Sequence, residues 1–323
     1  MNTDDPELEE SAQFEKLADE PLGKGAYGQV FRARRADGNA EFAVKDAEIA
    51  SKVPIWMHGI PRTMFQEVMV MKELRSAHVI PLQAVYVRAQ QVCTVMPLYT
   101  CDLKRVLSRH TALSEAHVKR LALSILEGLA FLHSHWFLHR DLSPANVFVD
   151  RAGNVLLADY GMATSFGTSR KFNYREEVVT LWYRAPELLL GAEMYQDKVD
   201  VWAFGCILAE IFLGGQPLFN GANREEQLAK IFAVLGTPGS KDNAGTLWPL
   251  AYSLIEFQLF EHRAPTPLAS VFTALDPEAV DLLQQCLALN PAERISASKA
   301  CAHPWFQRAP LPCDKAQLAF PGL

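Results

Sequence analysis

Residues able to perform chemistry are concentrated in one short segment, His139-Arg140-Asp141-Leu142-Ser143-Pro144-Ala145-Asn146. A carboxylate such as Asp141 can accept the proton of a hydroxyl group, and the amide oxygen of Asn146 can bind a metal ion. A second carboxylate follows in Asp159-Tyr160-Gly161. Oxygen ligands of this kind suit Mg²⁺ that is bound to nucleotide phosphates. The spacing therefore predicts activation of a hydroxyl group beside a metal–nucleotide complex.

A glycine-rich stretch lies far upstream, Leu22-Gly23-Lys24-Gly25-Ala26-Tyr27-Gly28-Gln29-Val30. Glycines let backbone N–H groups approach phosphates because no Cβ intervenes. Dinucleotide-binding folds show the same glycine spacing, but there the loop leads into a helix. Here strand residues and the turn Asp37-Gly38-Asn39 follow, so we predict a hairpin over the phosphates and disfavour a dinucleotide-dependent oxidoreductase. A glycine-rich hairpin without a ligand is the alternative for this motif taken alone.

Lys45 follows Ala43-Val44 in an expected strand, and Glu67 interrupts an apolar helical stripe formed by Met64, Met71 and Leu74. An acid within such a stripe needs a partner or is neutralised. We therefore expect an ion pair between Lys45 and Glu67, in which the other donors of Lys45 reach the α- and β-phosphates. The alternative is that both side chains are solvated, which is the usual fate of such residues.

The elements that must position these residues fall into two regions that meet near Leu98. Strand patterns over 22–44, 82–87 and 92–97, a loop over 47–60 and one helix over 61–75 precede a mainly helical region that extends to about residue 308. Ser114 is the expected N-cap of a helix with a stripe of Val118, Leu121, Ile125, Leu129 and Leu132, and a helix over 197–213 should end at Gly214-Gly215. The fold class is α+β. Its expected divisions are an acidic tail (1–13), a domain over 14–308 with lobes of about 14–98 and 99–308, and a C-terminal extension (309–323).

Composition excludes several function classes. The 323 residues carry a net charge of −6, which gives no general basic surface for nucleic acid. The N-terminus lacks the apolar core of a signal peptide, and the apolar stretch from Val201 to Leu213 contains Glu210 and is too short to cross a bilayer. The six cysteines show no C-x-x-C spacing, so neither a zinc site nor a redox motif is expected. We expect an intracellular protein of the nucleus or cytoplasm that binds neither nucleic acid nor membrane.

Three further motifs complete a recognisable pattern: Val178-Val179-Thr180-Leu181-Trp182-Tyr183-Arg184-Ala185-Pro186-Glu187, Asp200-Val201-Trp202, and Arg294. With the segments above, the sequence resembles the eukaryotic protein kinases and, among them, the cyclin-dependent-kinase-like (CMGC) Ser/Thr kinases. The resemblance covers about residues 14–308. It implies the two-lobed kinase fold, with a small antiparallel sheet plus one helix and a larger, mainly helical lobe. It also implies ATP and Mg²⁺ as cofactors, protein Ser/Thr hydroxyls as substrates, and a buried salt bridge between Glu187 and Arg294.

The resemblance assigns roles to individual residues. The implied catalytic set is Asp141, Lys45, Glu67, Asn146 and Asp159, of which Asn146 and Asp159 bind the metal. The implied ATP site comprises Leu22, Gly23, Lys24, Gly25, Ala26, Tyr27, Gly28, Gln29, Val30, Ala43, Lys45, the gatekeeper Met96, the hinge residues Pro97 and Tyr99, and Phe148. Val178, Val179 and Arg184 match the pocket for a proline after the target residue, which implies proline-directed substrates. Pro61 to Glu67 stand where these kinases carry a cyclin-binding helix, so a cyclin-like partner fits, although every kinase has this helix.

Departures from the family pattern affect catalysis and regulation. Ser143 replaces a lysine that touches the γ-phosphate in this branch, which predicts weaker transition-state stabilisation. The activation threonine aligns with Arg175, and the three arginines that would grip its phosphate align with Gln66, Arg140 and Thr164. We therefore hypothesise that this chain does not use activation-loop phosphorylation, and that Glu176 or Glu177 pairs with Arg140 instead. A pseudokinase scaffold is the alternative reading, which the intact catalytic set opposes.

Overall fold

The computed structural model describes most of the chain. The described residues are 14–25, 28–48, 62–88, 91–99, 101–109, 113–150, 152–166, 181–238, 248, 251, 260–261 and 263–318. The expected acidic tail (1–13) and most of the expected loop over 47–60 lie outside them, and the domain boundaries remain predictions.

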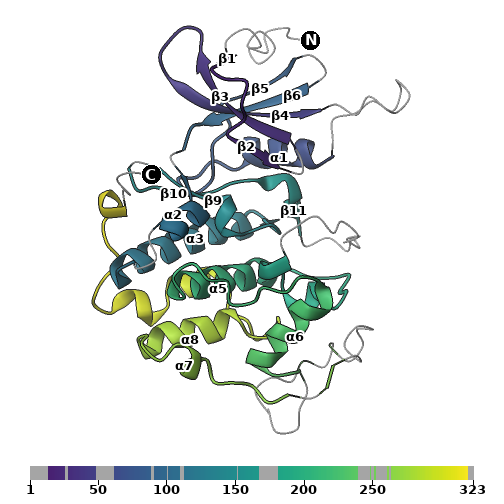
Figure 1. Cartoon of the computed structure of the whole chain (residues 1–323), viewed down its shortest axis with the longest axis vertical. Coiled ribbons are helices and arrows are strands. Elements are labelled where there is room, and N and C mark those ends of the chain that lie inside the picture. Colours follow the sequence, from purple (N-terminus) through teal and green to yellow (C-terminus); the bar gives the residue numbers. More distant parts are fainter. Residues whose placement is uncertain are drawn as a thin grey trace.

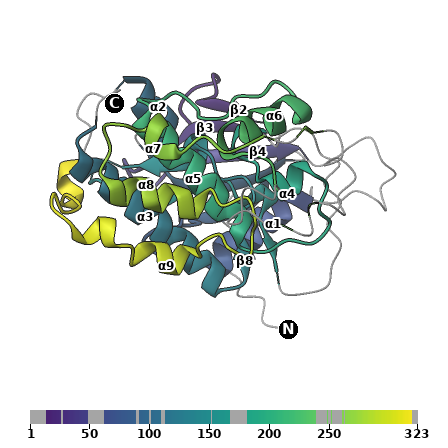
Figure 2. The same cartoon turned by 90° about the horizontal axis from the view of Figure 1, so that it is seen from below.

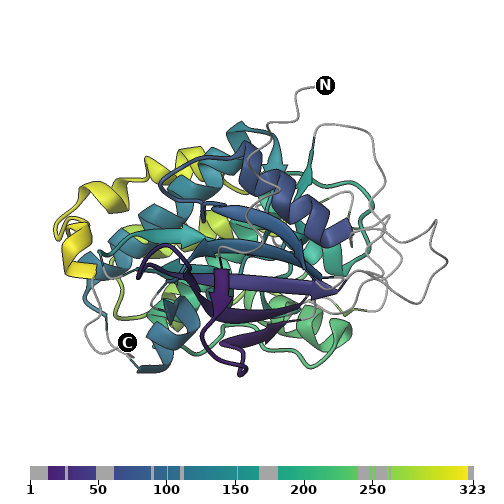
Figure 3. The same ribbon diagram turned by 90° about the horizontal axis from the view of Figure 1, so that it is seen from above.

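The smaller lobe is an antiparallel sheet flanked by one helix. The sheet contains β1 (Phe14–Lys16), β2 (Gly23–Gly25), β3 (Gly28–Arg35), β4 (Glu41–Glu48), β5 (Ala84–Arg88) and β6 (Gln91–Pro97). The strand order is β1-β3-β4-β6-β5, and β2 pairs with β3. Within the described part of this lobe one helix, α1 (Arg62–Glu73), runs alongside the strands (Figure 3). The predicted strands and helix form close to their expected bounds.

The glycine-rich stretch forms the predicted hairpin, because β2 pairs antiparallel with β3 and Gly25 stands opposite Gly28. Gly28 has φ +147°, and a Cβ built there would lie 2.1 Å from the carbonyl oxygen of Asp46 on β4. No other residue type fits this backbone without displacing β4. Glycine at this position therefore allows β3 to approach β4 closely at the end of β3 that adjoins the glycine-rich hairpin.

A small apolar cluster covers the face of the sheet that points away from the larger lobe. Phe14 stacks on Tyr86 with ring centroids 6.3 Å apart, and it contacts Phe42 edge-on at 5.3 Å. Lys16 pairs with the buried Asp46 and lies over the ring of Phe31. These contacts attach β1 to the rest of the sheet and so fix the strand that leads into the glycine-rich hairpin.

Helices dominate the larger lobe. They are α2 (Leu103–Arg109), α3 (Glu115–Ser134), α4 (Pro186–Leu189), α5 (Lys198–Phe212), α6 (Arg224–Leu235), α7 (Leu268–Val271), α8 (Pro277–Cys286) and α9 (Ala297–Cys301). Figure 1 shows this lobe below the sheet, with α5 between α3 and α8, and Figure 2 shows α9 next to α3. Its core is one continuous apolar cluster in which Trp202, Phe204 and Leu129 are completely buried.

Two predicted helix boundaries are confirmed. Ser114 caps α3, since its side chain accepts a hydrogen bond from the N–H of His117. The apolar helix α5 ends where Gly214 and Gly215 take φ values of +64° and +88°, and the N–H of Gly215 donates to the carbonyl of Glu210. Among the described residues, no helix is both long and apolar enough to span a membrane.

The chemistry-bearing segment lies between two short strands that belong to different sheets. β8 (Phe137–Leu138) pairs with β11 (Thr164–Ser165), whereas β9 (Val147–Val149) pairs with β7 (Cys101–Asp102) and β10 (Val155–Leu157). Pro144 begins a single 3₁₀ turn, η3 (Pro144–Asn146), since its fixed φ suits the first position of a helical turn and the N–H it lacks is not needed there. A second 3₁₀ turn, η4 (Tyr160–Met162), follows Asp159.

Part of the C-terminal extension packs on α3. The completely buried Lys119 donates to the carbonyl oxygens of Arg308 and Pro310 at 2.9 and 3.0 Å and pairs with Glu115. The N–H of Cys313 donates to the carbonyl of Ala116 at 3.0 Å. These bonds satisfy the buried ammonium group and fasten residues 308–313 to the lobe.

Candidate active site

A cleft of about 560 Å³ separates the two lobes and gathers most of the predicted site residues. Its volume falls in the range of small-molecule and cofactor sites. The predicted residues that line it are Leu22, Gly23, Gly28, Val30, Ala43, Lys45, Glu67, Met96, Pro97, Tyr99, Asn146, Phe148 and Asp159. The segments that supply them lie far apart in the sequence, so the cleft exists only once both lobes have folded.

Lys45 joins the two lobes at the inner end of the cleft. Its ammonium nitrogen lies 2.8 and 3.0 Å from the carboxylate oxygens of Glu67 on α1, and 3.1 Å from Oδ1 of Asp159. Burial acts to lower the pKa of Lys45, but the charges of Glu67 and Asp159 outweigh it and raise that pKa. Lys45 is therefore a fixed cation, and the predicted ion pair with Glu67 forms.

Asn146 and Asp159 line the larger-lobe side of the cleft, whereas Asp141 lies next to them but lines a second, smaller cavity. The side-chain amide of Asn146 donates to the carbonyl of Asp141 at 2.7 Å, and the N–H of Ala158 donates to the carbonyl of Asn146 at 3.0 Å. Asp159 adopts a left-handed backbone with φ +62°, a strained geometry for a non-glycine residue. These bonds tie the segment that ends at Asn146 to the segment that carries Asp159.

The electrostatic environment of Asp141 differs from that of a surface carboxylate. Burial raises its pKa first, and the nearby negative charge of Asp159 raises it further. The hydrogen bond from Asn146 and the charges of Arg184 and Lys45 oppose that rise. The resulting pKa is about 7, which suits a group that exchanges protons near neutral pH.

The buried Asp200 on α5 holds the catalytic segment from below. Its carboxylate accepts hydrogen bonds from the N–H groups of His139 and Arg140 at 2.9 and 2.8 Å, and it lies 2.9 Å from Nε2 of His133. Arg140 has φ +69°, so this anchor stabilises a left-handed backbone just before Asp141. His139 is completely buried and its Nε2 lies 3.0 Å from the carbonyl of Ala158, which indicates a structural role.

The segment from Leu181 to Glu187 is anchored at both ends. Its first part is the 3₁₀ turn η5 (Leu181–Tyr183), where the hydroxyl of Tyr183 donates to Glu210 at 2.6 Å. At its end Glu187 receives two hydrogen bonds from Arg294 at 2.7 and 3.0 Å, so the predicted buried salt bridge forms.

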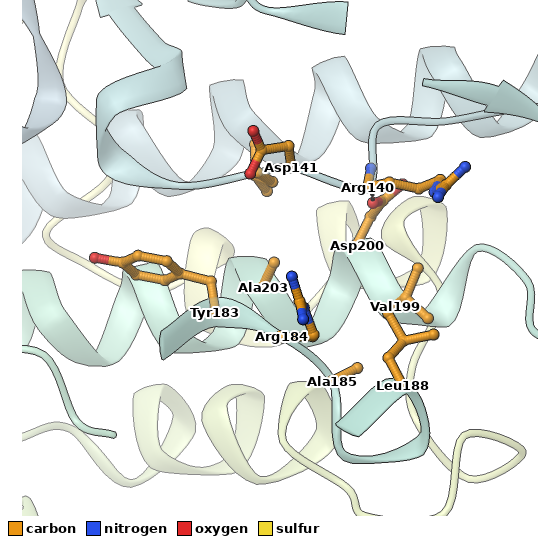
Figure 4. A pocket seen from close by; sticks show the side chains of 10 residues that line it. Arg140, Asp141, Tyr183, Arg184, Ala185, Leu188, Val199, Asp200 and Ala203 are labelled. Atoms are coloured by element: carbon orange, nitrogen blue, oxygen red, sulfur yellow. Dashed lines mark hydrogen bonds between the residues drawn. The ribbon is translucent and has the colours of Figure 1, made fainter. Parts of the chain in front are cut away.

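Figure 4 shows a small cavity between this segment and the catalytic loop. Asp141 lies above it and Arg184 below it. Its volume of about 20 Å³ holds roughly one water molecule, so it cannot accept a nucleotide.

Some predicted residues do not line the cleft. Gln29 is exposed, because it alternates along β3 with Gly28 and Val30 and so points to the opposite face of the sheet. Lys24 and Gly25 belong to β2, but beyond their backbone they lie outside the part of the chain that the structure describes. Ala26, Tyr27, Val178, Val179 and the residues proposed to replace the phosphorylation switch (174–177) lie outside the described residues.

The sequence reasoning missed several lining residues. Arg32 shares a strand face with Val30, so the period of two along β3 could have identified it. Ala158 directly precedes Asp159 and could have been found from that adjacency. Leu98 lies between the predicted hinge residues Pro97 and Tyr99, and Ala145 directly precedes Asn146. The others depend on tertiary packing that no local pattern reports, namely Ile80, Cys101, Asp102 and Arg105.

A second group of side chains that could bind a metal ion does not line the cleft, and hydrogen bonds explain why these side chains lie together. Glu278, Asp281 and His303 offer ligand atoms within 4.8 Å of one another. However, Nδ1 of His303 accepts the N–H of Trp305, so Nε2 carries the proton and donates to Asp281 at 3.0 Å. A metal ion would have to displace this proton, so we assign no metal to the group.

Comparisons with known proteins agree with this geometry. The family model "Protein kinase domain" matches residues 17–306. The chain is 36% identical over 305 residues to Cyclin-dependent kinase 20 of Pongo abelii, and the alignment covers 93% of this chain and 85% of that protein. It is 37% identical over 305 residues to Cyclin-dependent kinase 20 of Mus musculus, with the same coverage. The chain therefore belongs to the protein kinase family, as a cyclin-dependent-kinase-like (CMGC) protein serine/threonine kinase.

Proposed function

We propose that the chain transfers the γ-phosphoryl group of Mg²⁺-bound ATP to Ser or Thr residues that precede proline. The observation that carries this proposal is the position of Lys45 between Glu67 and Asp159, with Asn146 and Asp141 beside them. A cation and two carboxylates that converge at the end of a nucleotide-sized cleft match the requirements of phosphoryl transfer.

The residues present fit a magnesium–triphosphate complex. Asp159 offers carboxylate oxygens, and Asn146 offers its amide oxygen because its amide nitrogen is already bonded to Asp141. Mg²⁺ prefers oxygen ligands of this kind and usually takes only one or two from the protein. When bound, the ion neutralises the phosphate charge that would otherwise oppose transfer.

Protein side chains supply binding, orientation and proton acceptance. Val30, Ala43 and Phe148 provide apolar surface for the adenine, and the carbonyl of Pro97 and the N–H of Tyr99 can meet its polar edge. Lys45 holds the α- and β-phosphates while Glu67 fixes its direction. Asp141, with its pKa near 7, accepts the proton of the substrate hydroxyl.

Proline direction rests on the resemblance of the segment around Arg184 to the proline pocket of related kinases. Two of the three residues assigned to it, Val178 and Val179, are outside the described structure. The test is a pair of peptides that differ only in Ser-Pro against Ser-Ala. We expect transfer to the first to exceed transfer to the second by about tenfold or more in kcat/KM. Equal rates would refute proline direction while leaving phosphoryl transfer intact.

The outer face of α1 supports a protein partner of the cyclin type. Phe65 and Met69 are one helical turn apart, with exposed fractions of 54% and 39%. Large exposed apolar side chains on one helical face commonly mark a protein contact. Gln66 and Thr164 stand where an activating phosphate would need arginines, so we propose that partner binding, rather than activation-loop phosphorylation, sets activity.

Purified protein with γ-labelled ATP, Mg²⁺ and a Ser-Pro peptide tests the proposed reaction, with Asp141→Asn as the matched control. We expect label in the peptide with the wild-type chain and a loss of at least about 10²-fold in the variant. A scaffold without catalysis is the second candidate, favoured by the uncharged Ser143. It predicts ATP binding without transfer, even after addition of a partner that docks on α1.

A further inference from the structure

The C-terminal segment, residues 308–318, runs across the N-terminal half of α3. Besides the bonds from Lys119, Nε of Arg120 donates to the carbonyl of Cys313 at 2.5 Å, and Nε2 of His117 donates to the carbonyl of Gln317 at 3.1 Å. Side chains of one helix therefore bind backbone carbonyls along the whole segment, which gives the segment a fixed path over the lobe.

This path brings the last turn of the segment, η9 (Lys315–Leu318), against the turn that joins β9 to β10. Gly153 in that turn has φ +77°, and a Cβ built on it would lie 1.6 Å from the carbonyl oxygen of Lys315 and 3.1 Å from Cβ of Leu318. Leu318 is completely buried. The two backbones are thus in direct contact, and no side chain fits at position 153 unless η9 moves.

The turn itself is held by its own hydrogen bonds. Oδ1 of Asp150 accepts the N–H groups of Ala152 and Asn154, each at 2.8 Å, and Oδ2 accepts the side-chain amide of Asn154 at 2.8 Å. An aspartate that bonds to the backbone of the following residues stabilises a turn. A displacement of Gly153 is therefore passed on to Asp150, which directly follows β9.

β9 forms part of the wall of the cleft. Phe148 lines the cleft, and its ring centroid lies 6.1 Å from that of the hinge residue Tyr99. β9 also pairs with β7, where Cys101 stands opposite Val149 and Asp102 opposite Phe148. Cys101 and Asp102 line the cleft as well. The turn that η9 covers and this wall of the cleft therefore belong to one three-stranded sheet.

We propose that residues 313–318 position the nucleotide-binding wall of the cleft: η9 packs against Gly153, holds the turn between β9 and β10, and so fixes Phe148 and β7. The residues of this segment do not line the cleft, so they act through the sheet and not by contact with a nucleotide. The inference rests on the proposed binding of ATP in the cleft. It predicts that release of η9 weakens nucleotide binding although every group that contacts the nucleotide is retained.

Two substitutions release η9 in the full chain, and each has a matched control. Leu318→Asp places a charge where a leucine is completely buried, whereas Leu311→Asp makes the same change in the same segment at a side chain that is 61% exposed. Gly153→Ala places a methyl group in the space of the Lys315 carbonyl. Gly191→Ala is its control, because Gly191 has φ +84° and a Cβ built there meets no heavy atom of the described residues within 4 Å.

Melting temperatures show whether η9 and the turn are coupled. Gly153→Ala should lower the melting temperature more than Gly191→Ala, because both place alanine in a left-handed backbone but only the first displaces η9. This excess should disappear when Leu318→Asp has already released η9. Leu318→Ala takes the place of Leu318→Asp if the charged variant does not fold. Equal effects of the two alanine substitutions, or an excess that persists in the Leu318 variant, would overturn the proposal.

Hydrogen exchange followed by mass spectrometry shows how far the release extends, and it needs no nucleotide. Leu318→Asp should speed exchange in peptides that contain β7, β9 and the turn between β9 and β10, and it should leave α5 unchanged. Leu311→Asp should change none of them. Faster exchange that is confined to residues 308–318 would overturn the proposal.

Adenosine titration and ATP kinetics measure the consequence for binding. We expect Leu318→Asp and Gly153→Ala to weaken adenosine binding and to raise KM for ATP by about threefold or more, with little change in kcat. Ile231→Ala removes a completely buried side chain of α6, so it controls for a general loss of stability and should leave adenosine affinity unchanged. Unchanged adenosine affinity in both segment variants would overturn the inference. A wild type that binds no adenosine would instead refute the proposed function, while hydrogen exchange would still decide whether the segment holds β7 and β9.

Discussion

Glu187→Gln should destabilise the larger lobe severely, because it leaves a buried guanidinium group without its counter-charge. The side chain of Arg294 is completely buried and that of Glu187 nearly so, and their closest contact is 2.7 Å. Arg294 also donates to the carbonyl oxygens of Ala288 at 3.0 Å and Lys198 at 2.7 Å, and it lies over the ring of Trp202. A glutamine side chain at position 187 can accept one of the two hydrogen bonds that the carboxylate accepts from Arg294, but it carries no charge.

The size of the effect follows from the burial. Breaking a buried pair by neutralising one partner costs about 3–5 kcal/mol, which is a large share of the roughly 5–15 kcal/mol that stabilises a typical domain. For a domain of this size, each kcal/mol lowers the melting temperature by about 2 °C, so the expected shift is about 6–10 °C. The lost charge should also loosen the segment that carries Arg184.

Thermal unfolding followed by circular dichroism measures this shift. Glu226→Gln is the matched control, because Glu226 forms an exposed pair with Lys230 at 2.9 Å one turn apart on α6. It should leave the melting temperature nearly unchanged. A shift for Glu187→Gln as small as that of the control would show that the buried pair contributes little, and the reasoning from burial would be wrong.

Three further predictions follow from the site. Lys45→Met should lower kcat/KM by about 10²-fold or more, since it removes the cation that joins the lobes, and it should also lower the melting temperature because it leaves the buried Glu67 without its counter-charge; steady-state kinetics and thermal unfolding test this, and near-normal kinetics would contradict it. Ser143→Lys in the wild-type background should raise kcat, by about tenfold at most, because it adds charge beside the γ-phosphate; unchanged or lower activity in the same assay would refute this. His139 is buried with a lowered pKa, because burial disfavours its charged form, whereas an unfolded histidine has a pKa of about 6.5. Below that pH the unfolded state binds a proton on this histidine that the folded state excludes, so the contribution of His139 to the free energy of unfolding should fall as pH drops from about 7 to 5. The raised pKa of Asp141 acts in the opposite direction over the same range, so the measurement is the difference in chemical denaturation between the wild type and His139→Asn, and a difference that stays constant with pH would contradict the prediction.

Local patterns predicted the elements that depend on neighbouring residues. The glycines of the phosphate loop, the cap at Ser114 and the glycine pair after α5 each act over a few residues, and each forms where the sequence indicates. The ion pair between Lys45 and Glu67 spans two elements, but it was predictable because an acid in an apolar stripe has few alternatives.

Contacts between segments far apart in the sequence could not be predicted from such local patterns. Nothing near β8 indicates that it pairs with β11 instead of β9, because two-residue strands carry no register signal. The contact of Lys119 with carbonyl groups about 190 residues later also depends on how the chain ends pack. The exposed side chain of Gln29 has a different cause, since strand alternation turns it away from the cleft that Gly28 and Val30 line.

The proposed reaction requires Asp159 and Lys45 to meet around a metal-bound triphosphate. Isothermal titration of ATP with and without Mg²⁺, for the wild type and for Asp159→Asn, measures this requirement, with adenosine binding as a control for an intact cleft. We expect Mg²⁺ to strengthen ATP binding to the wild type and this gain to disappear in Asp159→Asn, while adenosine binds equally to both. An equal magnesium-dependent gain in the variant would show that Asp159 does not hold the ion.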